Sequence, residues 1–426
     1  MPLLNGYRHC PGDAGVCFLL LLSNPINGIL GPVRAKRPIR NLCPGLTKDD
    51  PALLKLVYVV NEASFFHSHR LPLAQEALAR GDEVVVACGE GTGETRLGAA
   101  GIRCRSFPLS RSGFNPLEEL RSFVALWRIY RDERPDLVHH VTIKPVLYGT
   151  PAARWSGVPA VVNAIPGLGF VFIRRGQLAR LRRMFVFLMY RLALSHPNMR
   201  VVFQNADDMQ TFIDSGVVDR RLVTLIRGSG VDLDEFRYLA EPPPPMTFLL
   251  VGRMLRHKGV LEFVEAAREV KRTHPDWCFQ LLGDVDPGNP ASLTPDQLRD
   301  WAQEGTVEWL GQRDDVADRM ADAHVVVLPS YREGLPKTLL EAAASGRAMI
   351  ASDIAGCREV VRSEVTGLLV PIRSHEELAS AMIRLGNDSE FRQRCGRAAR
   401  EKAEAVFSVN DVVRHTFLVY DQLQQA

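Results

Sequence analysis

The sequence lacks any apolar run close to the roughly 20 residues that a helix needs to cross a bilayer. Its eight cysteines form no C-x-x-C pair and no spacing typical of a zinc site. We therefore expect reduced thiols and a cytosolic protein. Apolar and charged residues occur in ordinary proportions, and 426 residues suffice for two globular domains.

The sequence also lacks a strong net charge, but its total of +3 hides an asymmetry. Residues 53–240 hold 24 Lys and Arg against 18 Asp and Glu, a balance of +6. Residues 241–426 hold 22 against 28, a balance of −6. The basic first half indicates an anionic partner for that half. The simpler alternative, that solvated surfaces vary in charge, stays open.

Residues 1–52 are often interrupted by Pro, Gly and Asn. An apolar run at 16–22 is too short to span a membrane and only weakly resembles the apolar part of a signal peptide. We expect a poorly ordered N-terminal extension over residues 1–52.

Two sets of strand-like runs alternate with helical stretches, and four prolines at 242–245 separate the sets. This alternation predicts two doubly wound domains, each with a parallel sheet, over residues 53–240 and 241–407. A last helix over 408–426 carries an apolar stripe and is expected to cross back onto the first domain. Ligands of such sheets bind beyond the carboxyl ends of the strands, which places the expected site in the cleft between the domains. The expected strands are 56–60, 84–88, 103–107, 137–140, 160–164 and 200–203, then 247–251, 278–282, 307–310, 325–328, 349–351 and 368–370.

Two glutamates flank a predicted turn and helix start in the second half. Glu333 precedes Gly334, and a helix is predicted to start near Pro336, because proline suits a first helical turn. The free N–H groups of that turn favour an anion. Glu341 would lie about one and a half turns into the helix. Two carboxylates beside an anion site suit a nucleotide-sugar, although a glutamate before a helix and another within it are common in any protein.

Three residues follow the first strand of the second half, where a ligand is expected. Gly252 lets the backbone approach a ligand closely. Arg253 offers a planar fork for phosphate oxygens, and Lys258 offers a point charge. The alternative is two surface bases near a loop.

One set of motifs is found mainly in the second half: Gly228–Asp232, Val251–Arg253, Lys258-Gly259, Pro329-Ser330, Glu333–Pro336, Glu341-Ala342 and Gly367–Pro371. Together these motifs resemble those of family 4 retaining glycosyltransferases of the GT-B fold, and the resemblance runs from about Lys55 to the C-terminus. A second set lies in the first half: Asn61-Glu62, Ser68–Pro72, His139–Pro145, Gly167–Phe170 and Phe203–Asn205. This narrower signature is similar to the bacterial subgroup that transfers N-acetylhexosamines onto undecaprenyl-diphosphate-linked saccharides, N-acetylgalactosaminyltransferases included.

The resemblance implies an α/β protein with two Rossmann-like domains facing a cleft, a nucleotide-sugar donor, and no metal or cofactor. Arg253 and Lys258 would hold the donor diphosphate, Glu333 would contact the sugar and Glu341 the ribose. The expected catalytic residues are thus Arg253, Lys258 and Glu333. The remaining donor-binding residues would be Gly252, Gly230, Gly334, Leu335, Pro336 and Glu341.

Acceptor binding is expected in the first domain. Lys144 follows a strand and is predicted to reach a diphosphate, and His140 is favoured over His139 as a donor to a hydroxyl or phosphate. Gly167 and Gly169 would form an acceptor loop, or alternatively a simple turn. Arg70 joins this set through the subgroup motif.

The stretch from Phe170 to Arg191 mixes arginines with aliphatic and aromatic residues. A basic, apolar helix of this kind suits the surface of an anionic membrane. The alternative is a core helix whose arginines reach solvent. The predicted membrane-facing arginines are Arg174, Arg175, Arg180, Arg182 and Arg183.

The predicted activity is retaining transfer of a sugar, an N-acetylhexosamine from UDP by resemblance, onto a polyprenyl-diphosphate-linked saccharide in O-antigen, capsule or glycoprotein glycan assembly. The enzyme would be peripheral on the inner face of the cytoplasmic membrane. A nucleotide-sugar epimerase or hydrolase of the same fold, and a non-catalytic sugar-binding relative, stay open. Nucleic acid is not expected as a partner, because no stacking platform accompanies the basic helix.

Overall fold

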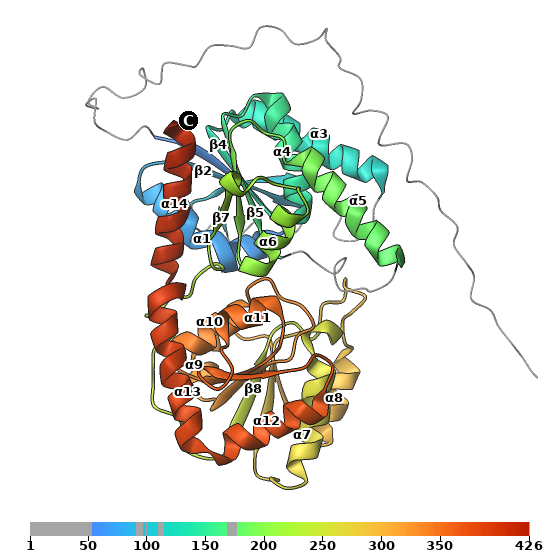
Figure 1. The fold of residues 1–426 in the computed structure, drawn as a ribbon, viewed down its shortest axis with the longest axis vertical. Helices are drawn as coiled ribbons and strands as arrows, with labels where there is room; N and C mark the ends of the chain where they lie inside the picture. The colour runs from blue at the N-terminus through green and yellow to red at the C-terminus, as the bar shows by residue number, and fades with distance from the viewer. Residues whose placement is uncertain (1–52, 91–96, 99, 110–114, 168–176, 426) are drawn as a thin grey trace, which may run out of the picture.

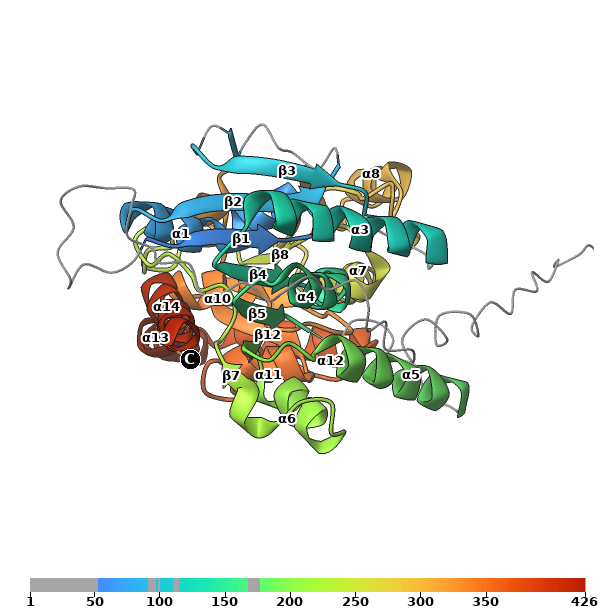
Figure 2. The ribbon, with the colours of Figure 1, turned by 90° about the horizontal axis from the view of Figure 1, so that it is seen from above.

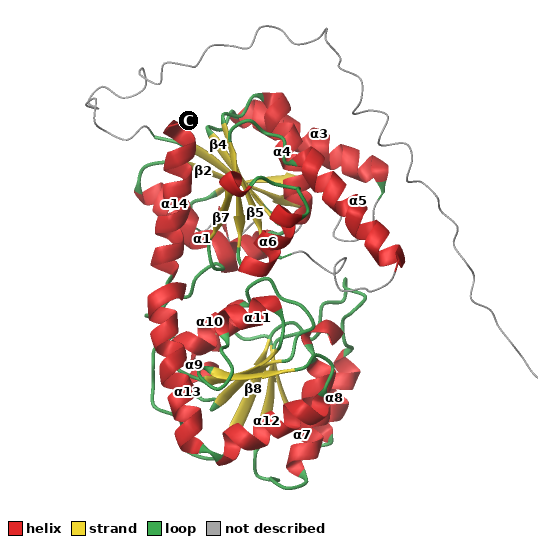
Figure 3. Ribbon diagram, viewed as in Figure 1, coloured by secondary structure: helices red, strands yellow, loops and turns green. Residues whose placement is uncertain are grey.

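The computed structural model describes residues 53–90, 97–98, 100–109, 115–167 and 177–425. Within them the chain forms two stacked α/β domains, each with helices on both faces of a sheet (Figures 1 and 3). The predicted N-terminal extension lies outside the described residues. The predicted fold class is confirmed.

The first domain contains a parallel sheet of seven strands in the order β3-β2-β1-β4-β5-β6-β7. Its inner strands β1, β2, β4, β5 and β6 are runs of mostly buried, mostly apolar residues, as a sheet covered on both faces requires, whereas the edge strand β3 is largely exposed and the edge strand β7 is half-buried. Six of them follow the predicted runs, whereas the three-residue β7 was not predicted. The strands are β1 Lys55–Val59, β2 Glu83–Gly89, β3 Arg103–Phe107, β4 Leu137–Val141, β5 Ala160–Ile165, β6 Met199–Phe203 and β7 Val223–Leu225.

The helices of the first domain divide between the two faces of this sheet. Helix α1 (Ala63–Ala79) covers one face, and α3 (Pro116–Glu133), α4 (Ile143–Ser156) and α5 (Gln177–Ala193) lie toward the other, as the view from above shows (Figure 2). Helix α6 (Ala206–Asp214) follows β6 and lies at the boundary with the second domain.

The second domain contains a parallel sheet of six strands in the order β10-β9-β8-β11-β12-β13. In both sheets the strand order reverses beside the first strand, between β1 and β4 and between β8 and β11. Such a switch point is where doubly wound sheets bind ligands. The strands are β8 Thr247–Val251, β9 Cys278–Leu282, β10 Glu308–Gly311, β11 Val325–Leu328, β12 Ala348–Ser352 and β13 Gly367–Val370.

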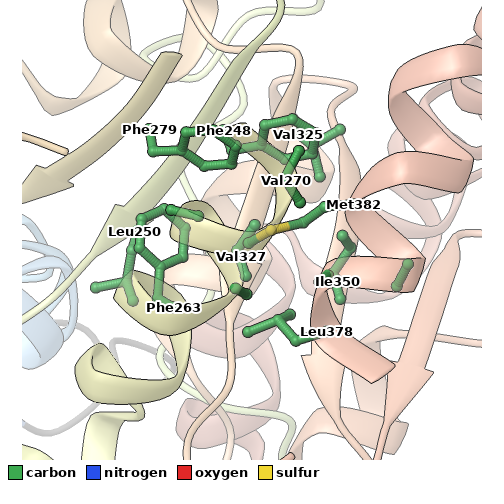
Figure 4. Packing of buried hydrophobic residues seen from close by; sticks show 14 of the residues in the cluster. Phe248, Leu250, Phe263, Val270, Phe279, Val325, Val327, Ile350, Leu378 and Met382 are labelled. Carbon is green, nitrogen blue, oxygen red and sulfur yellow. The ribbon is translucent and has the colours of Figure 1, made fainter. Parts of the chain in front are cut away.

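The larger apolar cluster of the second domain packs under α7 and α12. Phe248 and Phe279 stack with their ring centroids 5.2 Å apart, and Phe263 of α7 meets Phe279 edge-on (Figure 4). This packing holds β8 and β9, whose ends carry the candidate site. The helices are α7 Val260–Lys271, α8 Pro295–Gln303, α9 Val316–Ala321, α10 Lys337–Ala344, α11 Ala355–Val360, α12 His375–Asn387 and α13 Ser389–Lys402.

The last helix, α14 (Val409–Gln425), runs from the second domain back along the first (Figure 1). Its Tyr420 is fully buried there. The Tyr420 hydroxyl lies 2.6 Å from His139 Nδ1 and 3.3 Å from the Tyr58 hydroxyl. The C-terminus therefore completes the core of the first domain.

Candidate active site

Two neighbouring loops of the second domain are tied together at the switch point. The loop after β8 meets the loop after β11 where the Tyr331 N–H donates to the His257 carbonyl at 2.9 Å. The Thr338 hydroxyl donates to the Val251 carbonyl at 3.3 Å. A Cβ on Gly259 would lie 2.1 Å from the Pro329 carbonyl oxygen, so only glycine permits this approach. The loops that carry the predicted bases and carboxylates are thereby brought together.

The predicted pair of bases lies on the first of these loops. Gly252 has a positive φ of 155°, and a Cβ there would face open space. Arg253 is more than half exposed, and its guanidinium pairs with Asp286, which follows β9, at 2.8 Å. Lys258 pairs with Glu333 at 2.6 Å, and both side chains are largely buried. Burial, Lys258 and Arg253, in that order, lower the pKa of His257 between them to about 4.

Helix α10 begins at Lys337, with Pro336 at its N-cap, one position later than the predicted start near Pro336. Glu341 is 7 % exposed and pairs with Lys337 at 3.0 Å. Burial raises the pKa of Glu341, although Lys337 lowers it. Lys258 contacts Glu333, which precedes the first residue of α10 by four positions, so this base lies near the start of the helix.

This end of the second domain combines two cations, a helix N-terminus and two carboxylates. The cations and the free N–H groups can bind a diphosphate and stabilise charge that develops on it. The carboxylates can accept hydrogen bonds from hydroxyl groups.

The first domain contacts this site through two segments. A Cβ on Gly167 would lie 3.1 Å from the Gly334 Cα, and a Cβ on Gly334 would lie 1.4 Å from the Pro166 carbonyl oxygen. Asn205 donates from Nδ2 to the Gly334 carbonyl at 2.9 Å. Gly167 therefore lies against the loop that carries Gly334, whereas Gly169 lies outside the described residues.

The structure does not place His140 toward the cleft, which corrects the preference for it over its neighbour as an acceptor contact. It is fully buried, with Nε2 2.9 Å from the Tyr130 hydroxyl and Nδ1 2.8 Å from Asn163 Oδ1. Because strand residues alternate between faces, His139 points to the opposite face, toward Tyr420. Burial lowers the pKa of His140 to about 4.

Two other predicted ligand residues are engaged in structural contacts, and a third is buried. Arg70 of α1 is 4 % exposed, lies near Tyr58 and Tyr420, and its Nε has no hydrogen-bond partner among the described residues. Lys144 pairs with the buried Glu119 of α3 at 2.8 Å. A Cβ on Gly230 would lie 2.5 Å from the Val409 Cα, so this glycine accommodates the start of α14.

Sequence reasoning missed several residues of this region. Asp286 and Asp284 have D-x-D spacing after β9, a signal that was readable but overlooked. Across the described residues no group of three or more His, Cys, Asp or Glu is arranged to hold a metal ion. His69 of α1 lies close enough to Lys337 that this lysine, after burial, lowers its pKa, which falls to about 3. Its place in the Ser68–Pro72 motif was the available signal.

Helix α5 exposes an apolar stripe. Arg180 and Arg182 are exposed beside it and Arg183 is half-buried, whereas Arg174 and Arg175 lie outside the described residues. Among the described residues, no helix is both long enough and apolar enough to cross a membrane. The stripe consists of Leu181, Met184, Phe185, Leu188 and Leu192, each more than 40 % exposed.

Two family models match the chain, one in each domain. Residues 55–205 match the model described as glycosyl transferase 4-like. Residues 245–388 match the model of glycosyl transferases group 1. The two matches fall on the two sheets and leave the segment between them and α14 outside.

Two similar proteins have bacterial lipid-linked acceptors in their names. The first, from Campylobacter jejuni, is the N,N'-diacetylbacillosaminyl-diphospho-undecaprenol alpha-1,3-N-acetylgalactosaminyltransferase, 27 % identical over 85 % of this chain and 96 % of its own length. The second, from Escherichia coli, is the UDP-Gal:alpha-D-GlcNAc-diphosphoundecaprenol alpha-1,3-galactosyltransferase. It is 26 % identical over 67 % of this chain and 76 % of its own length.

Solved structures share the two-domain arrangement. HepE of Anabaena in complex with UDP has a TM-score of 0.69 at 19 % identity, covering 87 % of this chain and 100 % of its own. A sucrose-phosphate synthase from Thermosynechococcus elongatus has the same TM-score at 20 % identity, covering 87 % and 99 %. At this identity the likeness concerns the fold.

Proposed function

Because the chain belongs to the group 1, family 4-like glycosyltransferases with a GT-B fold, we propose that it transfers an N-acetylhexosamine from a UDP-sugar to a saccharide on undecaprenyl diphosphate. The observation that carries the proposal is the Lys258–Glu333 pair at the start of α10, beside the open backbone at Gly252. A cation and a carboxylate held 2.6 Å apart suit adjacent phosphate and sugar groups of one ligand.

The donor diphosphate would replace the carboxylates as the partner of the bases. Lys258 would turn from Glu333, and Arg253 from Asp286, toward phosphate oxygens. Glu333 would then accept hydrogen bonds from sugar hydroxyls, and Glu341 from the ribose. The amides of Gly334 and Leu335 and the start of α10 at Pro336 would face the same ligand, and the open side of Gly252 leaves room for it.

Retention of configuration would follow if the acceptor hydroxyl attacks the same face of the sugar from which the diphosphate departs. The bond between the anomeric carbon and the diphosphate oxygen breaks as the acceptor oxygen forms its bond. The acceptor proton passes to the departing phosphate oxygen. The bases stabilise the negative charge that grows on the diphosphate, a preset electrostatic contribution of a few kcal/mol for each donor. No metal or cofactor is required in this scheme.

The acceptor proposal is supported by both similar bacterial proteins, whose names specify undecaprenyl-diphosphate acceptors. The epimerase, hydrolase and non-catalytic alternatives are not favoured by these similarities. Gly167, which touches the donor loop, is the predicted acceptor residue whose placement fits this role.

A membrane-bound acceptor requires a surface that faces the bilayer, and we assign this to α5. Its exposed apolar stripe lies beside exposed arginines, which suits an anionic leaflet. Leu117 and Leu120 of α3 and Trp155 of α4 are also exposed, and Phe123 of α3 packs edge-on against Trp155. The enzyme would bind the inner face of the cytoplasmic membrane peripherally.

The decisive experiment combines purified protein, a panel of nucleotide-sugars and synthetic polyprenyl-diphosphate saccharides, with products identified by mass spectrometry. We expect one UDP-N-acetylhexosamine to extend the acceptor by one sugar, with and without a chelator. Consumption of donor alone at the same rate would favour a hydrolase or epimerase instead. No reaction across the panel would refute the proposal.

A further inference from the structure

Asn205 connects the two domains at the donor loop. It is 1 % exposed and caps α6, because its Oδ1 accepts from the Asp208 N–H at 2.8 Å. The other end of the same side chain donates to the Gly334 carbonyl at 2.9 Å and to Asp208 Oδ2 at 3.0 Å. One amide side chain of the first domain thus uses both ends, and one of them holds the backbone of the second domain.

Gly356 of α11 holds the same stretch of backbone from within the second domain. A Cβ at this position would lie 2.4 Å from the Gly334 carbonyl oxygen and 2.6 Å from that of Glu333. Both loop carbonyls therefore face α11, and the Gly334 carbonyl also faces α6. Helices α6 and α11 lie next to each other across the domain boundary (Figure 1).

The direction of these carbonyls fixes the direction of two N–H groups. In a trans peptide the C=O and the following N–H point to opposite sides of the chain. The Gly334 N–H therefore points opposite to the Glu333 carbonyl, and the Leu335 N–H opposite to the Gly334 carbonyl. In the described part of the chain neither N–H donates to another protein group. Both are turned away from α6 and α11, and so are available to a ligand.

We propose that Asn205 is a positioning residue for donor binding: by holding the Gly334 carbonyl, it aims the Gly334 and Leu335 amides at the donor diphosphate. This inference rests on the proposed function, because it takes the ligand of these amides to be a nucleoside diphosphate. It makes the order of the donor loop depend on contact between the domains. A donor would then be bound through its phosphates most tightly when the domains touch.

The variant Asn205→Ser separates the two uses of this side chain. Serine caps a helix as well as asparagine does, so α6 keeps its acceptor for the Asp208 N–H. It has no amide N–H to donate to the Gly334 carbonyl, and it sets no second carboxylate against Asp208 Oδ2, which lies 3.0 Å from Asn205 Nδ2. The matched control is Glu359→Gln, at the same domain boundary. Glu359 accepts from the Ala206 N–H at 3.0 Å and pairs with Arg227 at 3.1 Å, without touching the donor loop.

The first measurement is hydrogen exchange of the full-length protein without ligand. We expect faster exchange in peptides covering residues 331–340 for Asn205→Ser, unchanged exchange in α6, and unchanged exchange in 331–340 for Glu359→Gln. The second is affinity for UDP and for uridine. We expect UDP to bind Asn205→Ser roughly tenfold more weakly, the loss expected for charge-assisted hydrogen bonds, and uridine to bind about equally.

Unchanged exchange in residues 331–340 of Asn205→Ser would overturn the proposal. An equal rise in exchange of residues 331–340 in Glu359→Gln would also overturn it, because that result reflects loss of domain contact in general. An equal loss of affinity for UDP and for uridine would overturn it as well. The exchange result does not depend on turnover. A wild-type protein that transfers no sugar therefore refutes the proposed function, while the exchange data still decide whether Asn205 orders the loop.

Discussion

At the level of single residues, Lys258 is the side chain on which the proposed chemistry depends most. We expect Lys258→Ala to lower the rate of transfer by about 10²–10³-fold, the usual loss when a preset donor to a developing charge is removed. Steady-state kinetics with the donor and acceptor that the substrate panel selects would measure it. Arg268→Ala is the control, because Arg268 of α7 forms partly exposed ion pairs with Glu265 of the same helix and with Glu304 at the end of α8. An equal loss in both variants would contradict the assignment.

His140 supports the fold, and its effect should appear as a pH dependence of stability. Its native pKa is about 4, below the ordinary value of 6.5, so the unfolded chain binds a proton more readily. The contribution of neutral His140 to the free energy of unfolding is therefore complete above pH 6.5. It is lost as pH falls toward 4, and the free energy of unfolding then drops by up to about 3 kcal/mol.

We expect His140→Gln to lower the free energy of unfolding at pH 7.5 by about 1–3 kcal/mol, because Tyr130 and Asn163 lose matched partners. Between pH 7.5 and 5 the variant should lose less stability than the wild type. Urea denaturation at both pH values measures this. Equal losses would show that His140 does not titrate as stated.

The convergence of Lys258 and Glu333 was predictable, because both follow neighbouring strands of one sheet. Which face of the sheet His139 and His140 each point to was not, since alternation along a strand fixes opposite faces without saying which is which, and both side chains are buried. The contact of Asn205 with Gly334 joins residues 129 positions apart in different domains. It depends on how the domains pack, and no local pattern reports that.

At the level of elements, α5 shows where sequence periodicity suffices and where it does not. Its mixture of arginines and apolar residues predicted an amphipathic helix, but a core helix was equally compatible. The structure exposes Leu181, Met184, Phe185, Leu188 and Leu192 at helical spacing on one side. Short elements were harder to predict: β7 has three residues, too few for alternation to appear.

We expect the double variant Met184→Glu, Leu188→Glu to lose binding to vesicles containing phosphatidylglycerol, because each change removes apolar contact and adds repulsion from an anionic surface. Sedimentation with vesicles would measure it. Activity on a short-chain, water-soluble acceptor should be retained. Leu418→Glu, on α14 and 48 % exposed, is the control. Unchanged vesicle binding by the α5 variant would show that α5 is not the membrane-binding surface.

At the level of the whole molecule, α14 makes the two domains interdependent. Val412, Phe417 and Tyr420 join the same apolar cluster as β1 and α1, although the chain has by then passed through the entire second domain. The Val231 and Phe407 backbones are joined by a hydrogen bond of 2.8 Å where the chain crosses back. The alternation of strands and helices predicted two domains. The apolar stripe on residues 408–426 predicted that the last helix would pack against the first domain.

Tyr420→Ala should therefore destabilise the first domain, which is distant in sequence, by about 3–5 kcal/mol, as for other fully buried aromatic residues. The second domain lacks this contact, so its unfolding should change little. Calorimetry should resolve a transition at lower temperature, and hydrogen exchange should assign it to β1 and β4, which hold Tyr58 and His139. Leu418→Ala, exposed on the same helix, should leave both transitions in place. If exchange rose instead in β8 and β11, α14 would stabilise the donor domain, and the link between the C-terminus and the acceptor domain would have to be abandoned.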